Sequence, residues 1–368
     1  MERHWVNQPG TPGFAERASE RRAVSVIIPA RNEEHNIARC VRSAAAQNNV
    51  EEIIVVDDQS TDGTSEILGG LQKGVPALRV VRVDELPDGW LGKCYALATG
   101  AAAASGDWLL FTDADTEHLP GSLATLLARA ETEGIDLLSV SPGQVTETWW
   151  EKAVIPRVYV ELARRFRFED VNAPASPAAA ANGQYMLIRR EVYERVGGHE
   201  AVRNEILEDV ALARRVKLKG GRLLFLPGAP WVRTRMYRTF SEMWEGWTKN
   251  LYLLYERNLG KILGALAVAW FLDLAAPFVF IALGIWIVLG HASAFTVGAA
   301  AACLLATFTE HWRYGQALRS QGFDPRLAAY LLPGAALFAM LLLNSTGIHG
   351  WHGSVRWKGR RYSTTDRI

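Results

Sequence analysis

The sequence is poor in cysteine and has no apolar leader, and these absences argue against two classes of protein. Its three cysteines, Cys40, Cys94 and Cys303, are an odd number without metal-like spacing. Neither a disulfide framework nor a cysteine metal site is therefore expected. Residues 1–22 are largely polar and contain no hydrophobic core of a signal peptide. We expect a flexible N-terminal arm there, and a cytosolic location for everything before the first long apolar run.

Charge is nearly balanced over the chain, but it is almost missing from two long stretches. The formal net charge of +1 creates no field that would attract nucleic acid, so no nucleic-acid partner is expected. Between residues 262 and 309 the only ionisable side chains are Asp273, His291 and Cys303, and residues 327–348 carry no charge at all. Apolar runs of this length predict membrane-spanning helices.

The sequence leaves the number of spans open between three and four. Ile262–Gly290 would be roughly 43 Å long as a helix, against about 30 Å of hydrocarbon. It is therefore either one tilted span or two half-spans broken near Asp273 and Pro277. Further spans are Ser293–Thr309 and Leu327–Ile348, and the dense positive charge of the C-terminal tail favours four. Asp273 is either a functional intramembrane carboxylate or the site of a helix break.

Short buried strands alternate with helices in the first half of the chain, which is typical of an α/β fold. Apolar runs of this kind predict a mostly parallel sheet that is covered on both faces. Neither a G-x-G-x-x-G motif nor a phosphate-binding P-loop is present, which argues against a dinucleotide enzyme or an ATPase. The expected strands are Val24–Ala30, Glu52–Asp58, Leu78–Val83, Trp108–Asp113 and Ile135–Val140.

Acidic residues follow two of these strands at the end where open parallel sheets bind ligands. One pair is Asp57 and Asp58, and the other is Asp113 and Asp115. Alternating carboxylates at a strand tip can hold Mg²⁺ or Mn²⁺ together with diphosphate oxygens, and such a metal would neutralise a leaving nucleoside diphosphate. The alternative is ordinary turn chemistry, in which aspartate only caps the loop.

Several stretches together resemble the family 2 glycosyltransferases, which have the GT-A fold. The resemblance covers about residues 24–257 and implies a nucleotide-sugar donor, expected to be a UDP-sugar, and a divalent metal. Within that family the chain looks most similar to membrane-bound enzymes that act on isoprenoid-type lipids, the hopanoid-associated and carotenoid-type glycosyltransferases. The stretches are VSVIIPARNEE (24–34), IIVVDDQSTDGT (53–64), ASGDWLLFTDAD (104–115) and LED (207–209), and for the lipid enzymes GWLGKCYALATG (89–100), MYRTFSEMWEGWTKN (236–250) and VRWKGRRY (355–362).

The resemblance assigns a role in donor binding to each matching position. Pro29, Arg31 and Glu33 would line the nucleobase end of the donor site, with Asp58 near the base or ribose. Lys93 would approach the diphosphate or the sugar, and its alternative is a solvated loop lysine.

Catalysis and metal binding fall to three aspartates in this family. Asp113 would lie near ribose and sugar, and Asp115 would ligate the metal, so both are predicted at the metal. Asp209 would be the general base that takes the proton of the acceptor hydroxyl, which implies inversion at the anomeric carbon. Its alternative role is a plain cap at a helix N-terminus.

Arg235 and Arg238 occupy the place of the family's Q/R-x-x-R-W motif, where a guanidinium could hold the diphosphate. Position 239 is Thr where the motif has Trp, which argues against a polysaccharide synthase with a polymer channel.

We therefore predict an inverting glycosyltransferase that is a multi-pass protein of the cell (inner) membrane with a cytosolic catalytic domain. Its predicted partners are a nucleotide-sugar donor and a lipid acceptor at the cytosolic membrane face. The alternatives are a polysaccharide synthase-like transferase and a non-catalytic scaffold that retains the nucleotide-binding fold. The predicted parts are an arm (1–22), a GT-A domain (23–239), an amphipathic interfacial helix (240–260), transmembrane helices (261–348) and a basic tail (349–368).

Overall fold

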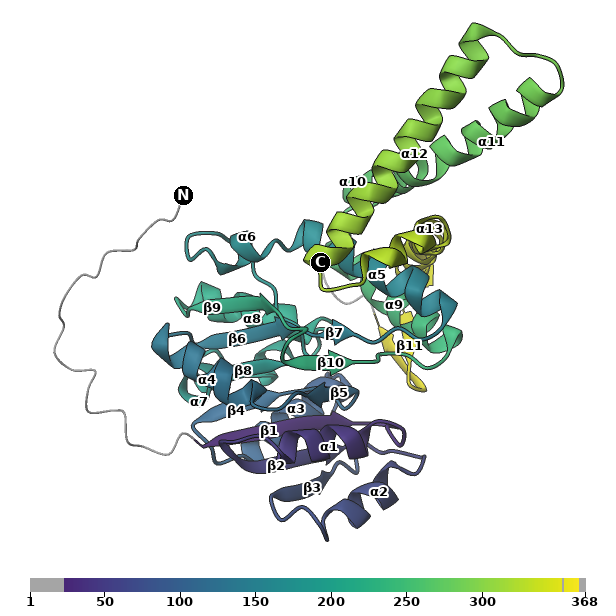
Figure 1. Cartoon of the computed structure of the whole chain (residues 1–368). Helices are drawn as coiled ribbons and strands as arrows, with labels where there is room; N and C mark the ends of the chain where they lie inside the picture. Colours follow the sequence, from purple (N-terminus) through teal and green to yellow (C-terminus); the bar gives the residue numbers. More distant parts are fainter. Residues whose placement is uncertain (1–22, 353, 364–368) are drawn as a thin grey trace, which may run out of the picture.

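A seven-stranded sheet forms the centre of the molecule (Figure 1). The computed structural model describes residues 23–352 and 354–363, so the predicted arm over 1–22 lies outside the described residues. The sheet is mostly parallel, as expected, and only β8 runs antiparallel to both of its neighbours. In spatial order the strands are β3 (Leu78–Arg82), β2 (Val50–Asp57), β1 (Val24–Ala30), β4 (Trp108–Phe111), β8 (Met186–Arg189), β6 (Leu137–Ser141) and β9 (Leu223–Pro227).

Helices cover both faces of this sheet because its strands are apolar on both sides. In β1 the side chains of Val26 and Ile28 pack into the cluster with α1 (Ile37–Ala45), α2 (Thr64–Leu71) and α4 (Ser122–Thr132). Ile27 points the other way, toward α3 (Gly92–Ala103), α7 (Arg190–Arg195) and α8 (Glu208–Leu218). Successive residues of a strand face opposite sides. Because β1 runs parallel to both β2 and β4, the loops after these three strands lie together at one edge of the sheet.

A small second sheet lies beside that edge. It consists of β5 (Thr116–His118), β10 (Val232–Thr234) and β7 (Gly143–Gln144), in that order. β5 is too short and too polar to be recognised in the sequence. Because β5 follows Asp115 directly, its pairing with β10 fixes the acidic loop after β4.

Three helices form a second core next to the sheet domain. They are α5 (Trp149–Arg165), α9 (Phe240–Leu254) and α13 (Leu331–Gly347), and α13 packs against both others. The buried face of α13 carries Phe338, Leu341 and Leu342. Thr239, which replaces the tryptophan of the family motif, begins α9: its side chain accepts a hydrogen bond from the backbone of Glu242 in a capping box.

A helical hairpin projects from this core, away from the sheet (Figure 1). One arm is the run α10 (Leu259–Val268), η3 (Ala269–Leu274) and α11 (Ala275–Val288), and the other is α12 (Ala294–Ser320). The first arm is one continuous helix with a π turn at η3, and two half-spans are not formed. Two helices among the described residues are long and apolar enough to cross a membrane, Leu259–Val288 and Pro325–Gly350.

Asp273 attaches the projecting hairpin to the catalytic body. It lies in η3, and its Oδ2 is 2.9 Å from Nη2 of Arg157 on α5. Both side chains are almost completely buried, and the guanidinium of Arg157 also lies over the ring of Phe338. A buried charge needs a partner of this kind. Asp273 therefore serves as the partner of a buried arginine at the π turn.

The end of the chain forms a β-hairpin where the sequence predicted only a basic tail. Strands β11 (Ser354–Trp357) and β12 (Arg360–Ser363) pair antiparallel next to α9. The remaining elements are α6 (Phe168–Asn172) and the short turns η2 (Glu200–Val202), η4 (Pro325–Tyr330) and η5 (Ile348–His352).

The ion pair between Arg157 and Asp273 predicts a specific pattern of stability. Asp273→Leu or Arg157→Leu alone leaves one buried charge without a partner, which costs about 3–5 kcal/mol. The double variant removes both charges, so we expect it to be more stable than either single variant. Chemical unfolding of the three variants in detergent micelles measures this difference. If the double variant loses the sum of the two single losses, the two residues are not coupled.

Candidate active site

A cavity of about 650 Å³ opens at the carboxyl ends of β1, β2 and β4. One end is polar and acidic, and the other runs between α5 and α9 and is largely apolar. The structure brings most of the predicted site residues together there. Those that line the cavity are Pro29, Arg31, Glu33, Asp58, Lys93, Asp113, Asp115, Asp209 and Arg238.

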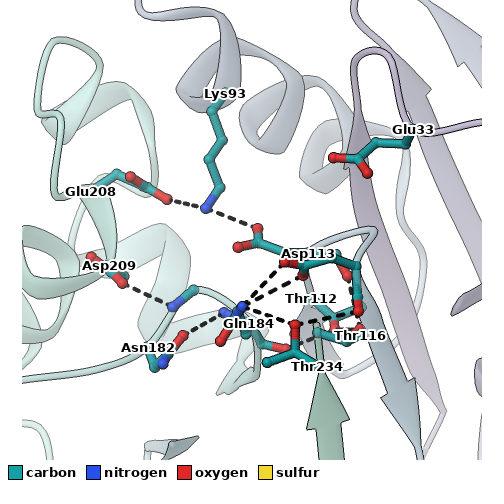
Figure 2. A network of polar contacts seen from close by, with 12 residues as sticks. Glu33, Lys93, Thr112, Asp113, Thr116, Asn182, Gln184, Glu208, Asp209 and Thr234 are labelled. Carbon is teal, nitrogen blue, oxygen red and sulfur yellow. Dashed lines mark hydrogen bonds and ion pairs between the residues drawn. The ribbon is translucent and has the colours of Figure 1, made fainter. Parts of the chain in front are cut away.

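Lys93 holds the centre of the polar end. It lies in the first turn of α3, and its Nζ is 2.8 Å from Oδ1 of Asp113 and 2.7 Å from Oε1 of Glu208 (Figure 2). Although burial works to lower it, the pKa of Lys93 is raised well above its ordinary value by Asp113, Glu208 and Asp209. Lys93 is therefore a fixed cation between β4 and α8, and its alternative as a solvated loop lysine is wrong.

Asp209 lies in the first turn of α8, where its carboxylate is oriented by the backbone. Its Oδ2 accepts a hydrogen bond of 2.8 Å from the backbone N–H of Gly183, and its Oδ1 accepts one of 2.8 Å from the backbone N–H of Val210. Burial and the neighbouring Glu208 raise the pKa of Asp209 to about 6. A carboxylate with a pKa near the working pH is suited to proton transfer.

Asp115 lies where several oxygen atoms have no adequate partner. Burial, followed by Asp113 and Glu33, raises the pKa of Asp115 to about 7. Its closest polar side chain is Gln184, whose Nε2 lies at 3.4 Å from Oδ2, while Oε1 of Gln184 is buried without a hydrogen-bond partner. This donor set fits a hard cation, which prefers oxygen ligands. Among the described residues, however, no group of three or more His, Cys, Asp or Glu side chains could hold a metal alone.

One side of the polar end of the cavity is formed by the loops after β1 and β2. Arg31 donates from Nη1 to the carbonyl oxygen of Asp58 at 2.7 Å, which ties the two loops together. The carboxylates of Glu33 and Asp58 are both paired with cations of the C-terminal hairpin, Lys358 and Arg360. The sequence analysis gave these two basic residues no role.

The two arginines of the R-x-x-R motif lie in different places. Arg235 is outside the cavity lining, because its guanidinium is engaged with Glu147 and Glu151 near the start of α5. Arg238 lines the cavity, and its Nη2 donates to Oδ1 of Asn36 at 3.0 Å, while its buried Nε has no partner. Only Arg238 is therefore placed to meet a ligand.

The other end of the cavity was not foreseen from the sequence. Its α5 side is apolar, whereas α9 contributes apolar side chains together with Glu242, Glu245, Lys249 and Asn250. Side chains of α5 and α9 face each other across it. Lys249 of α9 also lines it, and burial lowers the pKa of this lysine to about 8. The amphipathic pattern of residues 240–257 predicted a helix with one apolar face. Which of its residues line the cavity depends on the position of α5, which the pattern does not contain. The apolar lining includes Tyr159, Leu162, Ala163, Phe166, Trp247 and Leu254.

Comparison with known proteins identifies the class to which this fold and cavity belong. Residues 25–197 match the model of glycosyl transferase family 2. A mannosyltransferase from Pyrobaculum calidifontis, solved with GDP-Man and Mn²⁺, shares the fold, with a TM-score of 0.52 at 19% identity over 91% of this chain and 88% of that one. Residues 25–197 therefore form a glycosyl transferase family 2 domain, and the fold is the GT-A fold.

Curated relatives extend the similarity over almost the whole chain. The 4,4'-diaponeurosporenoate glycosyltransferase of Staphylococcus aureus strain USA300 is 29% identical over 351 residues, which cover 93% of this chain and 88% of the relative. The enzyme of the same name from strain MRSA252 is 28% identical over the same length. The similarity thus includes the helical hairpin and α13 as well as the sheet domain.

Lys93 should control the pH dependence of transfer through Asp209. Since Lys93 lowers the pKa of Asp209, Lys93→Met should raise that pKa above about 6. A base must be deprotonated, so the acid limb of the rate should move to higher pH. The measurement is the pH profile of the residual transfer rate, with Lys219→Met as the control at an exposed lysine. An acid limb that stays in place in Lys93→Met would contradict the coupling.

Proposed function

We propose that this enzyme moves a sugar, with inversion, from a UDP-sugar to an isoprenoid-type lipid acceptor at the cytosolic membrane face. The observation that carries the proposal is one continuous cavity with an acidic donor end and an apolar end, and with Asp209 in its lining. The polysaccharide synthase alternative is disfavoured because Thr239 caps α9 where that class has a tryptophan.

Donor binding follows from the charges at the polar end. The nucleoside lies against the loops after β1 and β2, beside Pro29, Arg31, Glu33 and Asp58. Arg238, with its unpaired Nε, interacts with the diphosphate. Lys93, held between Asp113 and Glu208, lies beside the phosphate that departs from the sugar.

A divalent cation, Mg²⁺ or Mn²⁺, fits beside Asp115. Asp115 and Asp113 would supply carboxylate oxygens to it, and the donor diphosphate would supply further oxygens, as is usual for Mg²⁺. When bound, the metal neutralises charge on the leaving nucleoside diphosphate. The raised pKa of Asp115 supports this, because crowded carboxylates favour a cation between them.

Asp209 acts as the general base toward the acceptor. The two backbone N–H groups hold its carboxylate in one orientation, so that it takes the proton as the acceptor oxygen attacks the anomeric carbon. Direct attack by the acceptor inverts the anomeric configuration. Glu208 is bound to Lys93 and is therefore not free for the same task.

The acceptor is a long apolar molecule because the far end of the cavity lies between α5 and α9, next to the membrane hairpin. The named activity of the Staphylococcus aureus relatives, transfer to diaponeurosporenoate, supports a carotenoid-type acceptor for this chain. A lipid whose chain extends into the bilayer can place its polar end beside Asp209 through this opening.

The membrane arrangement that fits the structure has two crossings instead of the three or four expected. Large apolar side chains are exposed along the hairpin, among them Phe278, Trp286, Phe295 and Phe308. Such a surface needs a lipid environment. Because the C-terminal β-hairpin contacts the catalytic domain, the chain crosses an even number of times. The two hairpin arms cross. The helix Pro325–Gly350, although long and apolar enough to cross, is the more buried of the two candidate spans, and its α13 part stays against α5 and α9.

The first test is transfer itself. Membranes containing the protein, labelled UDP-glucose, Mg²⁺ and Mn²⁺ should give label in the organic phase, and Asp209→Asn should reduce it at least about 100-fold, as loss of a general base does. Asp170→Asn, the same change at an exposed carboxylate, is the matched control and should retain full transfer.

Chelation and other donors complete the test. EDTA should abolish the organic label, and added Mn²⁺ should restore it. Transfer that survives both EDTA and Asp209→Asn would overturn the proposal. If UDP-glucose gives no label in the organic phase, the assay is repeated with UDP-galactose and GDP-mannose. Release of free nucleotide is then the readout.

The side of each loop tests the two-crossing arrangement. In a Cys303→Ser background, where the remaining Cys40 and Cys94 are buried, a cysteine at Ala292 in the hairpin tip or at Ser354 in β11 is labelled with a membrane-impermeant maleimide on intact cells. Ala292→Cys should react from outside, and Ser354→Cys should react only after lysis. Labelling of both from outside would require an odd number of crossings.

A further inference from the structure

The C-terminal β-hairpin packs against α9, and its turn contributes to the lining of the active-site cavity. Its two-residue turn, Lys358 and Gly359, has positive φ at both positions, 45° and 77°, as a tight hairpin turn requires. β11 rests on α9, and its Val355 is 3% exposed. The hairpin is thus anchored by packing, and Lys358 is part of the cavity lining.

Lys358 fastens this turn to the loop after β1. Its Nζ donates to the carbonyl oxygen of Arg31 at 2.9 Å and forms an ion pair with Glu33. In return, Nε of Arg31 donates to the carbonyl oxygen of Lys358 at 3.2 Å. The contacts are reciprocal, so the turn and the loop fix each other's position although more than 300 residues separate them.

Arg360 fastens the hairpin to the loop after β2. Its two terminal nitrogens contact the two oxygens of Asp58, Nη1 at 2.5 Å and Nη2 at 2.9 Å, and Nη2 also donates to Oε1 of Gln59 at 2.8 Å. Asp58 is buried, and the side chain of Arg360 is only 15% exposed. A bidentate pair of this kind has both strength and a defined geometry.

Gly92 provides independent support that this contact is built into the fold. A Cβ placed at Gly92 would lie 1.9 Å from Nη1 of Arg360 and 2.5 Å from Oδ2 of Asp58. The start of α3 therefore leaves room for this ion pair because residue 92 has no side chain. The first turn of α3 also carries Lys93, so the hairpin contact and the catalytic centre share one helix end.

We propose that the C-terminal hairpin completes the donor site, with Lys358 and Arg360 as positioning residues that set the affinity for the nucleoside diphosphate. Arg360 holds Asp58, and Lys358 holds Arg31 and Glu33, in the positions where they meet the nucleoside. The two cations also offset carboxylates that would otherwise repel the anionic diphosphate. This inference rests on the proposed function, because it assigns the same cavity end to the donor.

The test is nucleotide binding by the full-length protein in detergent, measured by calorimetry with UDP and then GDP in the presence of Mn²⁺. Arg360→Gln and Lys358→Met should each raise the Kd for the nucleotide about tenfold or more, since each removes charge-assisted hydrogen bonds. Lys358→Arg keeps the charge and should bind within about threefold of the wild type. Arg326→Gln is the control, since this arginine is exposed and paired only with nearby Asp324.

Kinetics separate positioning from general damage. In the transfer assay, run below the unfolding temperature of each variant, the donor KM should rise about tenfold in Arg360→Gln while kcat stays within about twofold. Equal nucleotide affinity in wild type and both variants would overturn the inference and leave the proposed function intact. Tighter binding in the variants would also overturn it, because the hairpin would then be a plug. A wild type that binds neither nucleotide would overturn the proposed function and this inference together.

Discussion

The crowding of carboxylates at one edge of the sheet is the constraint on which the rest of this molecule depends. Glu33, Asp58, Asp113, Asp115 and Asp209 all line one cavity. Burial is the first cause of the raised pKa values of Asp115 and Asp209, and repulsion by neighbouring carboxylates adds to it, from Asp113 and Glu33 at Asp115 and from Glu208 at Asp209. Lys93 offsets part of this negative charge at the centre of the cavity, and Lys358 of the C-terminal hairpin offsets part of it at the rim. The negative charge that these cations leave uncompensated would favour binding of a metal together with its ligand.

The second organising feature is the attachment of the catalytic domain to its apolar helices. Arg157 of α5 and Asp273 of the π turn form a buried ion pair, and α13 packs across α5 and α9. The helix that forms one wall of the cavity is therefore the same helix that holds the membrane hairpin. In the membrane arrangement proposed above, this shared helix would place that end of the cavity next to the bilayer, where a lipid acceptor would be found.

Much of the site could be predicted from the sequence because its residues follow strands. Asp58, Asp113 and Asp115 lie at strand ends, and parallel strands bring such ends to one edge. The motif carrying Asp209 was equally local. Arg235 and Arg238 show the limit: they are three residues apart, yet only Arg238 reaches the cavity, because Glu147 and Glu151 of a distant segment hold Arg235.

By itself, the sequence determined the alternating β/α pattern, the strand-end acids, the family resemblance and the apolar runs, since each depends on spacing within a short segment. Only the tertiary structure decided that Asp273 pairs with Arg157, that Gln184 lies beside Asp115, and that the basic tail folds back onto Arg31 and Asp58. These contacts join segments far apart in the chain. Their partners are chosen by packing and charge in three dimensions, which no local pattern records.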